Sequence, residues 1–276
     1  MLVRIITAIL WLAAILPCLI FSNTVLINIL VALLCLMSTF EMLRCTGLLK
    51  KKGISIPAFL AAAAVPFATR FSYLFQEKTV INSNVCISVL MLFIFVVFTY
   101  TVFSKGKCDI VNSSFVTLII MYIIGGLSAI ILIRDMPQGN VFYPLVFVAA
   151  WGTDIFAYFV GMLFGKHKLI PDVSPKKTIE GAIGGILGTT VLFAVYGMLF
   201  LHLETVQYIV LIAFAPFVSV VAQVGDLLMS LIKRNYGIKD YGKLLPGHGG
   251  VLDRFDSIIA VSLLLCITCG TINLLV

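Results

Sequence analysis

The sequence predicts an all-α membrane protein, a polytopic bundle of about nine transmembrane helices. Of the 276 residues, 61% are hydrophobic and only 11% are charged. The mean hydropathy is +1.15, which exceeds what a soluble domain can bury. The apolar stretches are also long enough to cross a hydrocarbon core, which takes about 20 residues of helix. Because strand-like alternation is absent, helices are the expected spanning form.

Nine apolar segments follow one another along the chain. The first comes after Arg4 and is followed by no small-residue cleavage site, so we interpret it as a retained span and not as a signal peptide. The third is the weakest, because Pro57, Pro66 and Arg70 interrupt it. The predicted spans are residues 2–21, 23–43, 54–75, 80–103, 115–133, 141–164, 179–201, 207–232 and 257–276.

The distribution of basic residues predicts the orientation of the bundle. Of the 19 Lys and Arg residues, all but Arg70, Lys78 and Arg134 fall on the side of the N-terminus. Cytoplasmic loops carry the excess of Lys and Arg, so we expect a cytoplasmic N-terminus and a C-terminus on the opposite side. The net charge of +7 is then explained by topology and by attraction to anionic lipid headgroups. No nucleic-acid partner is implied.

The seven cysteines do not form a recognisable site. They are odd in number and are scattered mainly through apolar segments without a disulfide framework. Cys266 and Cys269 form a CxxC pair, but it lies in an apolar run without the partners that a redox or zinc site needs. We expect small buried side chains.

Acidic residues are concentrated in the second half of the chain, where residues 151–276 contain eight of the 12 Asp and Glu residues. Asp154 and Asp226 fall inside predicted spans, where an ionised carboxylate costs about 2.5–3.5 kcal/mol. A functional role is the default for such residues, and a buried pair with a basic neighbour is the alternative. We therefore expect N-terminal transmembrane helices over 1–140 and a C-terminal transmembrane catalytic region over 141–276, with cytoplasmic loops 165–180 and 233–256.

A polar stripe extends from Asp226 toward the cytoplasm. Ser230 and either Lys233 or Arg234 share a helix face with this carboxylate, because positions i, i+4 and i+7 or i+8 lie on one side. Taken alone, the stripe fits a snorkelling ion pair equally well.

The loop that precedes the last span is rich in glycine, which lets backbone N–H groups approach a phosphate closely. Asp253 and Asp256 are spaced i, i+3 at a helix start, so both carboxylates can supply oxygen ligands for Mg²⁺. Lys239 and Arg254 could hold anionic oxygens beside them. Helix capping is the alternative for the two Asp residues and accounts for one of them. His248 either makes an ordinary hydrogen bond or takes part in proton transfer or phosphate contact.

A second loop, residues 166–180, forms the other half of the predicted site. Lys176 and Lys177 precede a helix N-terminus, where anions are favoured, although a topology signal explains these lysines equally well. The glycines that follow have the spacing of close helix packing and not that of a nucleotide-binding loop: Gly181, Gly184, Gly185 and Gly188.

The second half of the chain resembles the phosphatidate cytidylyltransferases (CDP-diacylglycerol synthases). The resemblance covers about residues 150–260 and includes Asp154 and the segments 174–178 and 180–181, whereas the first half is similar only as a set of apolar spans. The signature positions are Ser230, Ile232, Lys233, Arg234, Lys239, Asp240, Gly242, Leu245, Pro246, 248–251 and 253–256.

The resemblance implies transfer of CMP from CTP to phosphatidate, giving CDP-diacylglycerol and pyrophosphate for phospholipid biosynthesis. It implies Mg²⁺, in a paired arrangement with a second metal ion, and a homodimer at the level of the family. It also implies a multi-pass protein among membrane lipids, most simply in a bacterial inner membrane, with its active site facing the cytoplasm. The residues carried over are Asp226, Asp253 and Asp256 as metal ligands, Lys239 and Arg254 as further catalytic residues, and Ser230, Lys233, Arg234, Lys176, Lys177, His248, Gly249, Gly250 and Asp154 as substrate-binding residues.

Two other functions stay open at this stage. Cytidylyl or phosphoryl transfer to an isoprenoid lipid would use the same loop, because the tails of the acceptor are bound by apolar helices that look alike. An ion-coupled transporter also carries intramembrane Asp residues, but its site is expected near the midplane between repeats. No repeat is visible in this sequence.

Overall fold

The computed structural model describes residues 17, 19–74, 85–106, 108–201, 203–242 and 249–274. Within these residues, seven helical segments are long and apolar enough to cross a membrane, and each corresponds to one of the predicted spans. The last predicted span corresponds to α10 (Leu252–Leu274), and the first, 2–21, lies almost entirely outside the described residues. The helical membrane fold is therefore confirmed, whereas the total of nine spans and the side of the N-terminus stay predictions.

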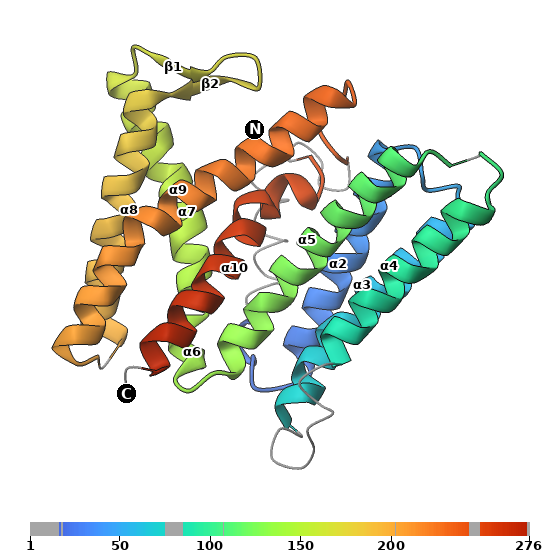
Figure 1. Cartoon of the computed structure of the whole chain (residues 1–276). Helices are drawn as coiled ribbons and strands as arrows, with labels where there is room; N and C mark the ends of the chain where they lie inside the picture. The colour runs from blue at the N-terminus through green and yellow to red at the C-terminus, as the bar shows by residue number, and fades with distance from the viewer. Residues whose placement is uncertain are drawn as a thin grey trace. The chain divides into compact units, whose positions relative to one another are not determined.

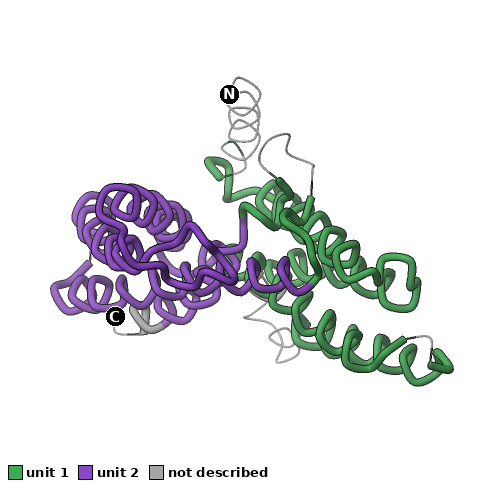
Figure 2. Tube along the Cα trace, turned by 90° about the horizontal axis from the view of Figure 1, so that it is seen from above, with its two compact units in different colours: residues 1–132, 236–254 green, residues 133–235, 255–276 purple. Residues whose placement is uncertain are grey.

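The chain forms two compact units, coloured separately in Figure 2. Unit 1 contains residues 1–132 and 236–254, and unit 2 contains residues 133–235 and 255–276. Each unit is therefore made of two separate stretches of the chain, and the boundaries differ from the predicted division at residue 140. The assignment of chemistry to 141–276 stays a prediction.

Unit 1 contains α2 (Leu26–Cys45), α3 (Lys52–Leu74), α4 (Val85–Phe103) and most of α5 (Ile110–Asp135). In Figure 1, α3 packs against both α2 and α4. All three predicted interruptions, Pro57, Pro66 and Arg70, lie inside the continuous helix α3. Asn28 on α2 is fully buried and donates a hydrogen bond of 2.7 Å to the carbonyl of Pro66, which ties the two helices together.

Unit 2 contains α6 (Gly139–Phe142), α7 (Pro144–Phe164), α8 (Ile179–Phe200), α9 (Thr205–Asn235) and most of α10. Helix α8 packs against α7 and α9. Between α7 and α8, β1 (Lys168–Ile170) and β2 (Ser174–Thr178) form an antiparallel hairpin, which pairs Lys168 with Thr178 (Figure 1). This hairpin is the one departure from the predicted all-α fold among the described residues.

Small residues allow α7 and α8 to approach closely. A Cβ atom at Gly184 would overlap Val160, and one at Gly188 would overlap the ring of Phe156. The predicted packing role of these glycines is therefore confirmed.

Three buried hydroxyl groups join the helices of unit 2. The Oγ1 of Thr153 on α7 lies 2.8 Å from the Oγ1 of Thr189 on α8 and 3.0 Å from the Oγ of Ser219 on α9. All three residues are fully buried. Interhelical hydrogen bonds of this kind fix the relative rotation of helices in lipid, where polar groups have few other partners.

Candidate active site

The β1–β2 hairpin presents the two predicted lysines at one end of unit 2. Its sequence folds locally because Thr178 caps α8, accepting a hydrogen bond of 3.1 Å from the backbone N–H of Gly181. The side chain of Glu180 accepts hydrogen bonds from the backbone of Lys166 and His167 and lies 2.6 Å from the His167 ring. Both ends of the hairpin are thereby fastened to the start of α8.

Helix α9 supplies the first acidic group of the site. The Nζ of Lys177, at the end of the hairpin, lies 2.5 Å from the Oδ2 of Asp226, and each side chain is 24% exposed. One turn later on α9, the Oγ of Ser230 lies 3.4 Å from the Oδ1 of Asp226. Asp226 is therefore paired with Lys177 from the second predicted loop. It also lies beside Ser230, its neighbour in the polar stripe predicted on its own helix.

Asp256 on α10 is the second acidic group and is buried. Its Oδ1 accepts a hydrogen bond of 2.8 Å from the backbone N–H of Ser257. The charges of Asp226, Lys233 and Asp154 act on this carboxylate, and the Oγ of Ser257 lies 3.5 Å from the Oδ2 of Asp154. Unit 2 thus brings together three carboxylates and two ammonium groups from four separate segments.

A cavity of about 280 Å³ opens beside this cluster. The polar groups that line it include Asp154 of α7, Lys176, Lys177 and Thr178 of the hairpin, and Gln223 of α9. Ala157, Met162 and other apolar side chains form much of the remainder. A cavity that joins two ammonium groups to an apolar wall suits a ligand with an anionic head and an apolar body.

The loop before α10 belongs to unit 1 and is held by two carboxylates. The Oδ2 of Asp253 accepts hydrogen bonds from the backbone N–H groups of Tyr241, at 2.8 Å, and Gly250, at 2.9 Å. Glu41, on α2, accepts hydrogen bonds from Val251, at 3.0 Å, and Leu252, at 2.8 Å. Sequence reasoning missed Glu41, although this residue satisfies the same criterion, an acid inside a span, that singled out Asp154 and Asp226.

The chain is similar to known proteins over most of its length. Residues 2–272 match the profile of the Cytidylyltransferase family. The chain belongs to this family. It is 37% identical to the phosphatidate cytidylyltransferase of Bacillus subtilis (strain 168) over 226 residues, which is 80% of each chain. It is 36% identical to the phosphatidate cytidylyltransferase of Staphylococcus haemolyticus (strain JCSC1435) over 259 residues, which is 94% of this chain and 95% of the relative.

Membership of the cytidylyltransferase family makes the chain a nucleotidyltransferase and sets the transporter alternative aside. The predicted residues of this cytidylyltransferase fall into two groups. Unit 2 holds Asp154, Lys176, Lys177, Asp226, Ser230, Lys233, Arg234 and Asp256, whereas unit 1 holds Lys239, Gly249, Gly250, Asp253 and Arg254.

The exposure, hydrogen bonds and backbone conformation of the other predicted site residues bear on their roles in the cytidylyltransferase. Lys239 and Arg254 are exposed. The Nε of Arg234 donates to the Val173 carbonyl at 3.3 Å, so this residue supports the hairpin. Gly249 has φ +88°, a conformation that favours glycine. His248 lies outside the described residues, and its role stays a prediction.

The carboxylates suit a divalent cation that is shared with a substrate. Among the described residues, no three His, Cys, Asp or Glu side chains form a ready-made metal cage. Mg²⁺ does not need one, because it is usually bound by one or two carboxylates together with substrate phosphate oxygens and water. Asp226 and Asp256 offer oxygen donors of this type, and their mutual repulsion would be relieved by a cation between them.

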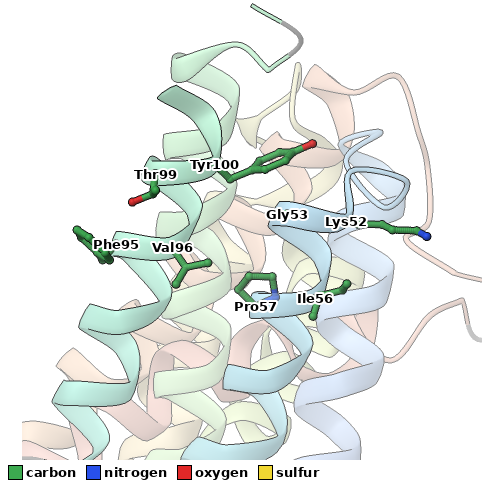
Figure 3. A pocket seen from close by; sticks show the side chains of 8 residues that line it. All are labelled: Lys52, Gly53, Ile56, Pro57, Phe95, Val96, Thr99 and Tyr100. Carbon is green, nitrogen blue, oxygen red and sulfur yellow. The ribbon is translucent and has the colours of Figure 1, made fainter. Parts of the chain in front are cut away.

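A larger hollow in unit 1 has a different character. A groove of about 480 Å³ runs along α3 and α4 between Pro57, Phe95 and Val96, and Lys52 is among the residues that line it (Figure 3). Its lining is almost entirely apolar. Such a surface suits lipid acyl chains.

Proposed function

We propose that this cytidylyltransferase transfers CMP from CTP to phosphatidate and forms CDP-diacylglycerol and pyrophosphate. The observation that carries the proposal is the cluster in unit 2, where Lys177, Asp226 and Asp256 converge beside a cavity with an apolar wall. The names of the relatives support the same reaction.

The reaction places a particular electrostatic demand on the site. An oxygen of the phosphatidate phosphate attacks the α-phosphorus of CTP, a new P–O bond forms, and the bond to the β-phosphate breaks so that pyrophosphate leaves. Two polyanions must therefore be brought into contact, and neutralisation of their charge is the main catalytic requirement. The attacking oxygen is already anionic, so no nucleophile–base triad is needed.

The residues of unit 2 can meet this demand by exchanging partners. In the absence of substrate, Lys177 neutralises Asp226. We infer that a substrate phosphate takes the Lys177 ammonium, while Lys233 and Lys176 bind further anionic oxygens. Asp226 is then free to act as a metal ligand, and Ser230 stays beside it as a hydrogen-bonding group.

Asp226 and Asp256 are the proposed ligands of Mg²⁺, and Asp253, one turn earlier on α10, is a third candidate. When bound, the cation would offset the negative charge that develops on the phosphate oxygens. The stoichiometry of Mg²⁺ binding to the purified protein would distinguish one metal ion from two. We further propose that the site faces the cytoplasm, where soluble CTP is available, and that the family-level homodimer applies to this chain.

Purified protein provides the direct test. Pyrophosphate release is followed with CTP, Mg²⁺ and a panel that contains phosphatidate, a polyprenyl phosphate and a lipid without a phosphate. We expect pyrophosphate release and CDP-diacylglycerol formation when phosphatidate is the lipid, and no release with the other two lipids. Preferential release with the polyprenyl phosphate would replace the proposed acceptor by an isoprenoid lipid, and an absence of release with every lipid would overturn the proposal.

A further inference from the structure

Glu41 occupies an unusual place for a residue of the first half of the chain. Its side chain is only 4% exposed, inside a membrane-spanning helix. Its two carboxylate oxygens accept separate hydrogen bonds, Oε1 from the N–H of Val251 and Oε2 from the N–H of Leu252. Leu252 is the first residue of α10 and Val251 comes directly before it. The first N–H groups of a helix have no partner within the helix.

The carboxylate therefore acts as the N-terminal cap of a helix 210 residues away in the sequence. A capping group normally comes from the helix itself or from the residue just before it, but here the position before α10 is occupied by Val251, which has no side-chain acceptor. A negative charge at this end is also favoured by the helix dipole. Glu41 supplies what the local sequence lacks.

Two glycines of the loop make room for this carboxylate. A Cβ atom at Gly242 or at Gly250 would overlap the carboxylate oxygens of Glu41. The sequence alone suggests that these glycines admit a phosphate, but in the structure the group that lies against them is the side chain of Glu41. A side chain at either position would displace the cap.

Arg44, one turn further along α2, holds the other end of the same loop. Its Nη2 donates a hydrogen bond to the carbonyl of Tyr241. Helix α2 thus holds Tyr241 through Arg44, and Val251 and Leu252 through Glu41. The side chain of Asp253 links the same two parts of the loop, because it accepts hydrogen bonds from the N–H groups of both Tyr241 and Gly250.

We propose that Glu41 is a positioning residue for the cytidylyl transfer. It fixes where α10 begins and in which direction its first turn runs, and this turn carries Asp253 and leads directly to Asp256. The inference rests on the proposed function only for its effect on turnover. Its structural content, a cap supplied by α2, is independent of the reaction.

The test compares Glu41→Ala with Ser38→Ala, a change at a fully buried residue one turn earlier on α2. Amide hydrogen exchange and steady-state kinetics are measured on the full chain in detergent. We expect Glu41→Ala to speed exchange selectively at residues 249–255 and to lower kcat by roughly 10²-fold, as misplacement of catalytic groups by about 1 Å does. The KM for CTP should change by no more than a few-fold, and Ser38→Ala should change neither measurement.

Two further variants separate position from charge and guard against misfolding. Glu41→Gln keeps the length and one acceptor oxygen, whereas Glu41→Asp keeps the charge but is shorter by one methylene group. A positioning role predicts that Gln retains more amide protection and more activity than Asp. Higher activity in Glu41→Asp than in Glu41→Gln would overturn the inference. Unchanged amide exchange at residues 249–255 in Glu41→Ala, or faster exchange throughout α2 and α3 in that variant, would also overturn it.

The failure of this inference can be told apart from failure of the proposed function. If the wild-type protein releases no pyrophosphate with any lipid phosphate, the proposed function fails, while the exchange data still decide whether Glu41 caps α10. If the wild type is active and Glu41→Ala has normal kcat and normal exchange, the positioning role alone is wrong.

Discussion

The ammonium group of Lys177 and the carboxylate of Asp226 lie 2.5 Å apart, although one belongs to the β1–β2 hairpin and the other to the long apolar helix α9. This pair explains how an acid can be retained in an apolar helix without a bound ligand. In the proposed reaction, Lys177 exchanges Asp226 for a substrate phosphate.

We expect Lys177→Gln to lower kcat/KM by roughly 10- to 100-fold, since a charge-assisted hydrogen bond contributes about 1.5–3 kcal/mol. Pyrophosphate release measures the effect. Lys168→Gln is the matched control, because Lys168 is an exposed lysine on the other strand of the same hairpin. Equal activity in the two variants would show that a lysine at 177 serves topology alone.

Asp226→Asn and Asp256→Asn should each lower kcat by roughly 10² or more, because loss of a charged Mg²⁺ ligand removes several kcal/mol of transition-state stabilisation. The activity of each variant is followed across a Mg²⁺ titration. Asp172→Asn, at the exposed turn of the hairpin, should leave the titration unchanged. A wild-type titration in Asp226→Asn and Asp256→Asn would contradict the metal assignment, although not membership of the family.

Asp253→Asn separates a metal ligand from a structural brace. The carbonyl oxygen of Asn can accept the same two hydrogen bonds that Tyr241 and Gly250 donate to Oδ2 of Asp253, so a bracing role predicts near-normal turnover. As a metal ligand, Asp253 needs its charge, and we expect a loss of roughly 10² in kcat. Near-normal kcat would leave Asp226 and Asp256 as the proposed ligand pair.

The close approach of α7 and α8 gives a prediction for stability. Gly188→Ala should destabilise the protein by about 1–3 kcal/mol, because the new methyl group overlaps the Phe156 ring. Thermal unfolding in detergent should then occur several degrees lower. Gly125→Ala is the control, since a Cβ atom there meets no described atom within 4 Å, and it should be neutral or slightly stabilising. Equal melting temperatures would contradict the packing of the two helices.

Cysteine labelling tests the orientation that the basic residues predict. In a variant without the seven native cysteines, Asn235→Cys, at the end of α9, should react with a membrane-impermeant reagent from the cytoplasmic side. Asn140→Cys, between α5 and α7, should react from the opposite side. Both positions are exposed. The reverse pattern would place the site away from cytoplasmic CTP.

The spans could be predicted from the sequence because hydropathy and length act locally. Asp154 and Asp226 stood out because a carboxylate in an apolar helix is costly, and Asp256 because of its spacing from Asp253 at a helix start. The structure brings Asp154, Asp226 and Asp256 together in unit 2. The partners of these acids could not be assigned in the same way. Lys177 was open to a topology role, and only the fold places it beside Asp226.

The β1–β2 hairpin was not predicted because its residues are mostly exposed and therefore lack the alternation of a half-buried strand. Glu41 was missed for another reason. It lies near the end of a predicted span, beside basic residues that we used to predict orientation. Its hydrogen-bond partners, Val251 and Leu252, are too distant in the sequence to be inferred from its neighbours.

The separation of 210 residues between Glu41 and Val251 has a consequence for the biogenesis of the protein. Helix α2 enters the bilayer early in synthesis, whereas the amides that satisfy its carboxylate are made only when translation is nearly complete. Asp226 meets the opposite situation, because Lys177 has already been synthesised when α9 emerges. During insertion, α2 must therefore carry an acid whose final hydrogen-bond partners have not yet been synthesised.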